Sequence, residues 1–129
     1  MNININIYKL ILLALSFIIF VALDYVYLNL FSSHFKQQIL DVQHSPLEFK
    51  LIPAIVCYIA LVFGLNYFIL QRNGSALDAA LLGLVIYTVY ETTNMAIIKK
   101  WNLKSVLIDS IWGGILFGLT TFIINKINI

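Results

Sequence analysis

Four long apolar segments, separated by polar links, constrain this chain more than any other feature. They cover about residues 8–30, 49–70, 76–98 and 105–124 of the 129-residue sequence. A helix needs about 20 mostly apolar residues to cross the hydrocarbon core of a bilayer, and each segment has that length. The sequence therefore predicts an all-α, multi-pass membrane protein in which residues 1–129 form a single domain.

The short connections predict how the spans are arranged. Consecutive spans joined by a few residues must be antiparallel neighbours, which favours an up-down bundle of four transmembrane helices. The longer link after the first span carries Phe31, Phe35 and Ile39 at helical spacing. That pattern is typical of a short helix lying in the membrane interface. Ser45-Pro46-Leu47-Glu48 then resembles a capping box for the second span, and Pro53 is expected to kink that span.

The composition excludes several classes of protein. With 61% hydrophobic and 11% charged residues, the chain has too little charge to cover the surface of a water-soluble domain. A net charge of +2 spread over short loops gives no footprint for nucleic acid. The single Cys57 excludes an internal disulfide and a multi-cysteine metal site. No glycine-rich phosphate loop or metal-binding histidine spacing occurs, so neither a cofactor nor a metal is expected.

Basic residues are distributed unevenly between the two ends of the predicted bundle. Five follow spans one and three: Lys36, Lys50, Lys99, Lys100 and Lys104. The opposite end has three: Lys9, Arg72 and Lys126. Because cytoplasmic loops carry the excess of lysine and arginine, the loops after spans one and three are predicted to be cytoplasmic.

Three acidic residues lie inside the apolar segments. Asp24 is near the end of span one, Glu91 is near the end of span three, and Asp109 is near the start of span four. Since the spans alternate in direction, all three are expected in the same half of the bilayer, facing the bundle interior. A charge at that depth costs a few kcal/mol, and no lysine or arginine lies at equal depth. The acids must therefore be protonated, hydrated, hydrogen-bonded, or bound to a cation.

Helical spacing adds polar neighbours to these acids. Residues three or four apart share a helix face, and Tyr58 belongs to the same half of the bilayer. The predicted intramembrane cluster comprises Asp24, Tyr58, Tyr87, Glu91, Thr93, Asn94, Asp109 and Trp112. Two interpretations remain open: these groups satisfy one another and fix helix register, or they line a site open to one side of the membrane.

Small residues four positions apart mark faces where helices approach closely. Such pairs are Ala60 with Gly64, Ala79 with Gly83, and Gly114 with Gly118. Apolar attraction between helices is weak in lipid, so small residues that let backbones approach support association. These faces suit packing within the bundle, and they are also candidates for contacts in a homo-oligomer.

The motifs resemble a known family. Tyr90-Glu91-Thr92-Thr93-Asn94, then Trp101, then Asp109-Ser110-Ile111-Trp112-Gly113 is similar to the pattern of domain-of-unknown-function family 2177. Its members are small predicted membrane proteins, mostly bacterial, which implies a bacterial inner or cell membrane. The chain departs from the family pattern at Glu91, where Asp is usual, and at Asn102, where Pro is usual. The family has no established activity.

Three functions are compatible with these features. The first is a transport-type protein, active as an oligomer, whose acids handle protons, cations or small solutes. The second is an enzyme, or the partner subunit of an enzyme, that modifies a membrane lipid with the acids as general acid and base. The third is a structural or assembly subunit. The lipid bilayer is the expected partner, with a lipid or a small cationic solute as candidate ligand.

Overall fold

The computed structural model describes residues 2–127 of the chain, with side chains from residue 5 onward. Its elements are helix α1 (Asn2–Leu30), helix α2 (Ser32–Gln43), helix α3 (Leu51–Phe68), the 3-10 turn η1 (Leu70–Arg72), helix α4 (Ala76–Ile97) and helix α5 (Leu103–Ile127). Four of these helices are long and apolar enough to cross a membrane. The predicted all-α fold with four spans is confirmed, and no strand occurs within the described residues.

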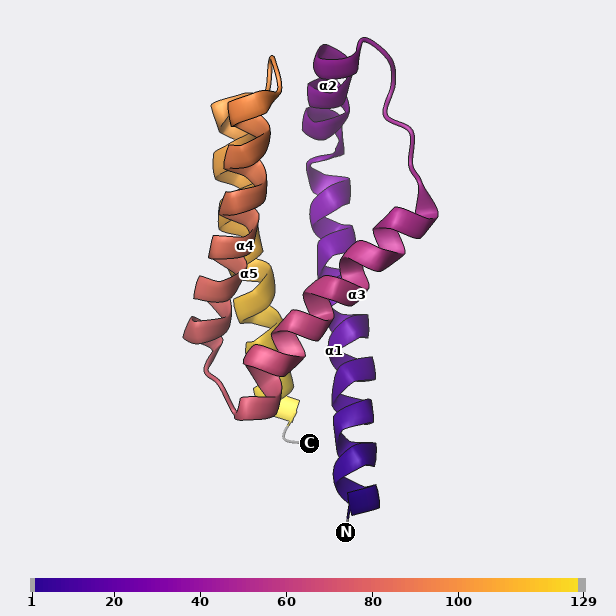
Figure 1. Cartoon of the computed structure of the whole chain (residues 1–129), viewed down its shortest axis with the longest axis vertical. Coiled ribbons are helices and arrows are strands. Elements are labelled where there is room, and N and C mark those ends of the chain that lie inside the picture. The colour runs from indigo at the N-terminus through magenta and orange to yellow at the C-terminus, as the bar shows by residue number, and fades with distance from the viewer. Residues whose placement is uncertain (1, 128–129) are drawn as a thin grey trace.

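The four long helices pack unequally (Figure 1). Helices α4 and α5 form a hairpin whose members contact each other along their length, and α1 packs against both α3 and α5. Helix α3 slants across the bundle, so that its first turns diverge from the other helices while its last turns lie beside the lower end of the α4–α5 hairpin (Figure 1). Direct contact between α3 and α4 is sparse.

The second span begins later than the sequence pattern indicates, which corrects two details. Residues 46–50 are not helical, and Lys50 precedes α3 without a side-chain cap, so Ser45 to Glu48 do not form a capping box. The Gln43 amide instead donates to the carbonyl oxygens of Ser45 and Pro46, at 3.2 and 2.9 Å. Pro53 therefore lies in the first turn of α3, where the backbone N–H has no helical partner in any case. It removes no hydrogen bond and is no cause of a kink.

Helix α2 continues from α1 after a break at Phe31, where the backbone leaves helical geometry (φ −108°, ψ 16°). In Figure 1 it extends roughly along the direction of α1 and does not turn across the ends of the other helices. The predicted short helix is thus present, and its direction differs from that of a helix lying flat in the interface. Tertiary contacts explain this direction, because α2 is docked against the turn between α4 and α5.

One buried glutamine makes most of that contact. Gln38 is 1% exposed; its amide donates to the Lys100 carbonyl at 2.6 Å, and its Oε1 accepts from the Asn102 backbone N–H and the Ser105 hydroxyl at 3.1 and 2.9 Å. His34 joins the same contact through a 2.8 Å hydrogen bond to the Ser105 hydroxyl. Asn102 also caps α5, its Oδ1 accepting from the Ser105 N–H at 2.8 Å. The α2 helix is therefore hydrogen-bonded to the start of α5.

Replacing Gln38 by alanine is expected to loosen α2. The change leaves the buried Ser105 hydroxyl and the Asn102 N–H with fewer partners, which should destabilise the protein by about 1–3 kcal/mol. The adjacent Gln37→Ala is the matched control, because Gln37 is exposed and makes one hydrogen bond to Asp41 on its own helix. Thermal unfolding in detergent and amide hydrogen exchange over α2 measure the difference. Equal exchange rates in the two variants would contradict the docking role of Gln38.

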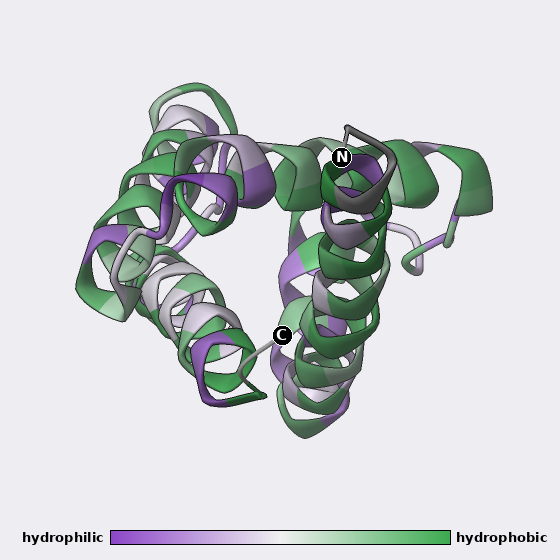
Figure 2. Cartoon of the chain, turned by 90° about the horizontal axis from the view of Figure 1, so that it is seen from below, coloured by the Kyte–Doolittle hydropathy of each residue, from purple (hydrophilic) through white to green (hydrophobic). Residues whose placement is uncertain are grey.

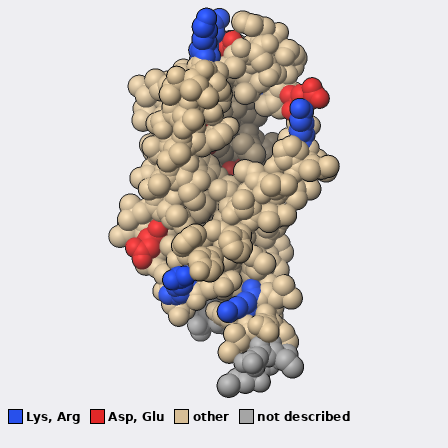
Figure 3. All heavy atoms as spheres, in the orientation of Figure 1, with Lys and Arg blue, Asp and Glu red and all other residues tan. Residues whose placement is uncertain are grey.

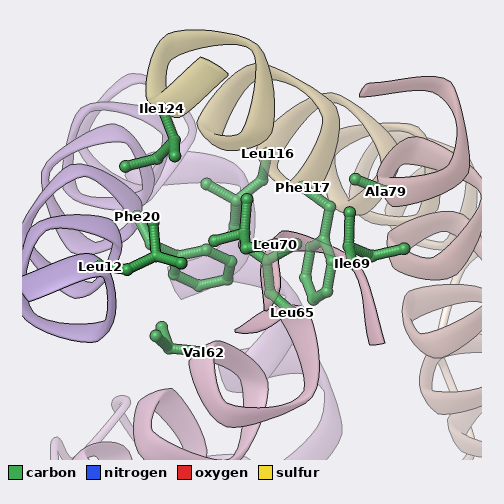
Figure 4. Close-up of a cluster of buried hydrophobic side chains, with 10 residues drawn as sticks. All are labelled: Leu12, Phe20, Val62, Leu65, Ile69, Leu70, Ala79, Leu116, Phe117 and Ile124. Carbon is green, nitrogen blue, oxygen red and sulfur yellow. The ribbon is translucent and has the colours of Figure 1, made fainter. Parts of the chain in front are cut away.

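The apolar core is a cluster of ten buried side chains (Figure 4). Side chains from α1, α3, α4 and α5 with their adjoining turns meet there: Leu12, Phe20, Val62, Leu65, Ile69, Leu70, Ala79, Leu116, Phe117 and Ile124. Hydrophobic colouring also dominates the outward faces of the long helices (Figure 2), as a lipid environment requires. The same helices also bury polar side chains at this level, where the Asn66 amide donates to the Ser16 hydroxyl at 2.9 Å.

The α4–α5 hairpin depends on two close glycine contacts. A Cβ at Gly83 would lie 2.2 Å from the Gly113 carbonyl oxygen, and a Cβ at Gly113 would lie 2.3 Å from the ring of Tyr87. The space around Gly114 is larger, because an added Cβ would lie 3.3 Å from its nearest neighbour, the Ala80 carbonyl oxygen. At Gly64 no atom lies within 4 Å. The backbones of α4 and α5 therefore approach most closely at Gly83 and Gly113. On α3, by contrast, no neighbouring helix packs closely against Gly64.

Candidate functional site

The three intramembrane acids lie at the end of the bundle where α1 ends and α5 begins. Figure 3 shows that the visible lysines, arginines and acids gather towards the two ends of the molecule, apart from acidic atoms seen deep in a hollow between the helices. Asp24 is 7% exposed and Glu91 is 2% exposed, while Asp109 is half-buried. Antiparallel packing brings them to one level, because Asp24 and Glu91 come late in their helices and Asp109 comes early in α5.

Asp24 is held by two neutral donors. The Tyr58 hydroxyl of α3 donates to its Oδ2, and the Trp112 indole N–H of α5 donates to its Oδ1 at 2.9 Å. Both carboxylate oxygens therefore have a partner, and each partner comes from a different helix. This arrangement fixes α1 relative to α3 and α5. Asp24 thus has a clear structural role within the cluster.

Asp109 is connected to Asp24 through a stacked aromatic pair. The Tyr27 hydroxyl donates to Asp109 Oδ1 at 3.1 Å, and its ring stacks on Trp112 with centroids 4.6 Å apart and planes 2° from parallel. Tyr27 and Asp24 lie three residues apart on α1, as do Asp109 and Trp112 on α5, so each acid shares a helix face with the aromatic donor of the other. The stacking keeps both donors in position.

Glu91 and Asp109 form a pair of carboxyl groups. The Trp101 indole N–H, from the turn after α4, donates to Glu91 Oε1 at 2.9 Å. The carboxyl groups of Glu91 and Asp109 are neighbours across the α4–α5 hairpin and interact electrostatically. Two carboxylates this close repel each other unless they share a proton or hold a cation between them. The donors that the structure assigns to these acids are tyrosine and tryptophan groups, which carry no positive charge.

A cavity of about 320 Å³ reaches Asp109 from the gap between α3 and α4. Its walls are Cys57 and Leu61 of α3, Ile86, Tyr87 and Tyr90 of α4, and Asp109 of α5. Tyr87 is positioned by its contact with Gly113. Cys57 is exposed. The cavity thus leads from the outer surface of the bundle to one of the paired carboxyl groups.

The structure gathers most of the residues predicted for the cluster and leaves two outside it. Asp24, Tyr58, Tyr87, Glu91, Asp109 and Trp112 are brought together by the contacts above. Thr93 is exposed, because two residues of helix rotate it about 200° from Glu91; this corrects its assignment. Asn94 is half-buried one turn nearer the helix end, and its backbone carbonyl oxygen accepts from the Ile98 N–H at 2.8 Å.

Two residues of the cluster lie outside the predicted set. Tyr27 donates to Asp109 and Trp101 donates to Glu91. The i, i+3 spacing of Asp24 and Tyr27 is a signal for the first. Nothing in the spacing of Trp101 along the chain indicates Glu91 as its partner. Within the part of the chain that the structure describes, no three His, Cys, Asp or Glu side chains gather closely enough to hold a metal ion.

These features define a multi-pass helical membrane protein with a polar cluster in one half of its bundle. The chain belongs to the family described as predicted membrane protein (DUF2177), whose family model matches residues 9–124. The match extends over all four spans and confirms the resemblance seen in the motifs. Among curated proteins and among solved structures, nothing matches this chain. The family description gives a location and no activity, so a function must be argued from the geometry of the site.

Proposed function

We propose that this protein handles cations, the proton included, in a transport-type role, and that Glu91 and Asp109 are the groups that bind them. The observation that carries the proposal is the close pairing of these two carboxyl groups in a half of the bundle that has no basic side chain at their depth. A bound cation or a shared proton removes the repulsion between them. Burial then strengthens the attraction between the cation and the two carboxyl groups, because the local dielectric constant is low.

The division of roles among the acids supports this proposal. Asp24 accepts from two donors on two other helices, so its carboxylate is already satisfied. Glu91 and Asp109 each have one aromatic donor, on Oε1 and Oδ1 respectively. Their second oxygens are available for a cation or for each other. Asp109 also lines the cavity, so open space lies beside one member of the pair.

The distribution of lysines indicates the side of the membrane from which cations reach the paired acids. The end of the bundle that holds the acids also carries Lys36, Lys99, Lys100 and Lys104. By the positive-inside rule this end faces the cytoplasm, so the paired acids exchange cations on the cytoplasmic half of the membrane. Four spans enclose little volume, and passage to the other side therefore requires a homo-oligomer or a change in the path of α3.

Cation-dependent stability tests the proposal. The purified full-length protein in a neutral detergent is unfolded thermally with Na⁺, K⁺ or guanidinium, and with N-methylglucamine at equal ionic strength as control. A cation that binds the folded protein at 100 times its Kd stabilises it by about 2.7 kcal/mol, so a clear rise in the unfolding temperature is expected. Proton movement is measured separately, with a pH-sensitive dye in proteoliposomes under an imposed potential. The absence of both effects would contradict the proposal.

A further inference from the structure

The cavity between α3 and α4 opens sideways, at a depth that belongs to the lipid hydrocarbon. Its outer wall is formed by exposed residues: Cys57 is exposed and Tyr90 is 58% exposed. Cys57 lies six residues after the start of α3, and Tyr90 lies seven residues before the end of α4. At 1.5 Å per residue along the helix axis they are about 9 Å and about 10.5 Å from these helix ends. A ligand would therefore enter this cavity from the acyl chains and not from water.

The lining changes in character from the mouth to the back of the cavity. Leu61 and Ile86 offer apolar walls, Tyr87 and Tyr90 offer aromatic rings, and Asp109 is the charged or proton-bearing group. A carboxylate attracts a positive nitrogen, and tyrosine rings favour a cation near their faces. An anionic headgroup would be repelled by Asp109 and by Glu91 beside it. The volume of about 320 Å³ lies within the range of small-molecule pockets, about 300–1,000 Å³.

We propose that this cavity binds a lipophilic amine, with one positively charged nitrogen at Asp109 and an apolar body between Leu61 and Ile86. This inference rests on the proposed function and deepens it, because it names the class of cation that the site takes. An alkylammonium ion that partitions into the membrane reaches the site through the gap left by the slanting α3. Its nitrogen lies between Asp109 and the tyrosine rings, and its chain remains in an apolar environment.

Labelling of Cys57 tests the proposal, because this residue is the single cysteine of the chain and lines the cavity. The full-length protein in phosphatidylcholine nanodiscs is treated with N-ethylmaleimide in the presence of decyltrimethylammonium, tetramethylammonium or decyl sulfate. We expect labelling without ligand, and a slowing of at least about tenfold, equivalent to 1.4 kcal/mol, with decyltrimethylammonium alone. Decyl sulfate controls for chain length, and tetramethylammonium controls for charge.

Two variants separate binding in the cavity from general effects. Asp109→Asn should abolish the protection by removing the charge, and Leu61→Trp should abolish it by filling the cavity while both acids remain. Protection that persists in Asp109→Asn would overturn the proposal. The proposal would also be overturned if Cys57 did not react with N-ethylmaleimide in the free protein, or if all three probes slowed its labelling equally. Protection by tetramethylammonium as strong as that by decyltrimethylammonium would also overturn it, while leaving the proposed function intact. If the proposed function itself is wrong, the Na⁺, K⁺ and proton measurements fail as well.

Discussion

Glu91→Gln is expected to abolish the cation-dependent rise in unfolding temperature while leaving the protein folded and at least as stable. The glutamine side-chain oxygen can still accept from the Trp101 indole, which lies 2.9 Å from Oε1 in the native protein. The substitution preserves shape and removes a buried charge, and such changes are often neutral or stabilising. Proton movement in proteoliposomes should decline to the level of protein-free vesicles. Asp109→Asn should behave in the same way, because it removes the other member of the pair.

A structural role for the acids predicts a different result. If Glu91 serves only to fix helix register, Glu91→Gln keeps every cation response of the wild type, and that outcome would contradict the proposed function. Glu91→Ala is the informative companion, because it removes the acceptor for Trp101 as well as the charge. A buried donor without a partner costs about 1–3 kcal/mol, so this variant should lose stability. Thermal unfolding in detergent compares the three proteins under identical conditions.

Gly83→Ala should destabilise the protein more than any other glycine-to-alanine change in the membrane-spanning helices except that at Gly113. The added Cβ would lie 2.2 Å from the Gly113 carbonyl oxygen and 2.7 Å from the Phe117 ring. The carbonyl belongs to the backbone of α5, so the hairpin itself must separate, and overpacking of this kind costs about 1–3 kcal/mol or more. Because Gly113 also supports Tyr87, separation of the hairpin should alter the cavity wall as well.

The control for this substitution is Gly64→Ala on α3. Both changes add one methyl group inside an apolar helix and gain the same helix propensity, about 1 kcal/mol, but nothing lies within 4 Å of a Cβ at Gly64. Gly64→Ala should therefore be neutral or stabilising, and Gly114→Ala should lie between the two. Unfolding temperatures in detergent give the order. Equal stability of Gly83→Ala and Gly64→Ala would contradict the close approach of α4 and α5.

The periodicity of the sequence was sufficient for the fold class and for the depth of the acids. Apolar length alone defines the four spans, because the bilayer has a fixed thickness. Alternating direction places Asp24, Glu91 and Asp109 in one half of the bundle. Helical spacing also identifies Tyr87 and Trp112 as neighbours of these acids, because residues three or four apart share a face whatever the tertiary structure.

Tertiary structure decided which groups meet across helices. The pairing of Glu91 with Asp109, and the separate hydrogen bonding of Asp24 by Tyr58 and Trp112, depend on the rotation and tilt of each helix. A pattern within one span carries no information about these two quantities. The same limitation explains the incorrect capping box, since the chain between α2 and α3 is held by Gln43 and by the docking of α2. The cavity at Asp109 exists because α3 crosses the bundle obliquely, and only the packing of whole helices sets that angle.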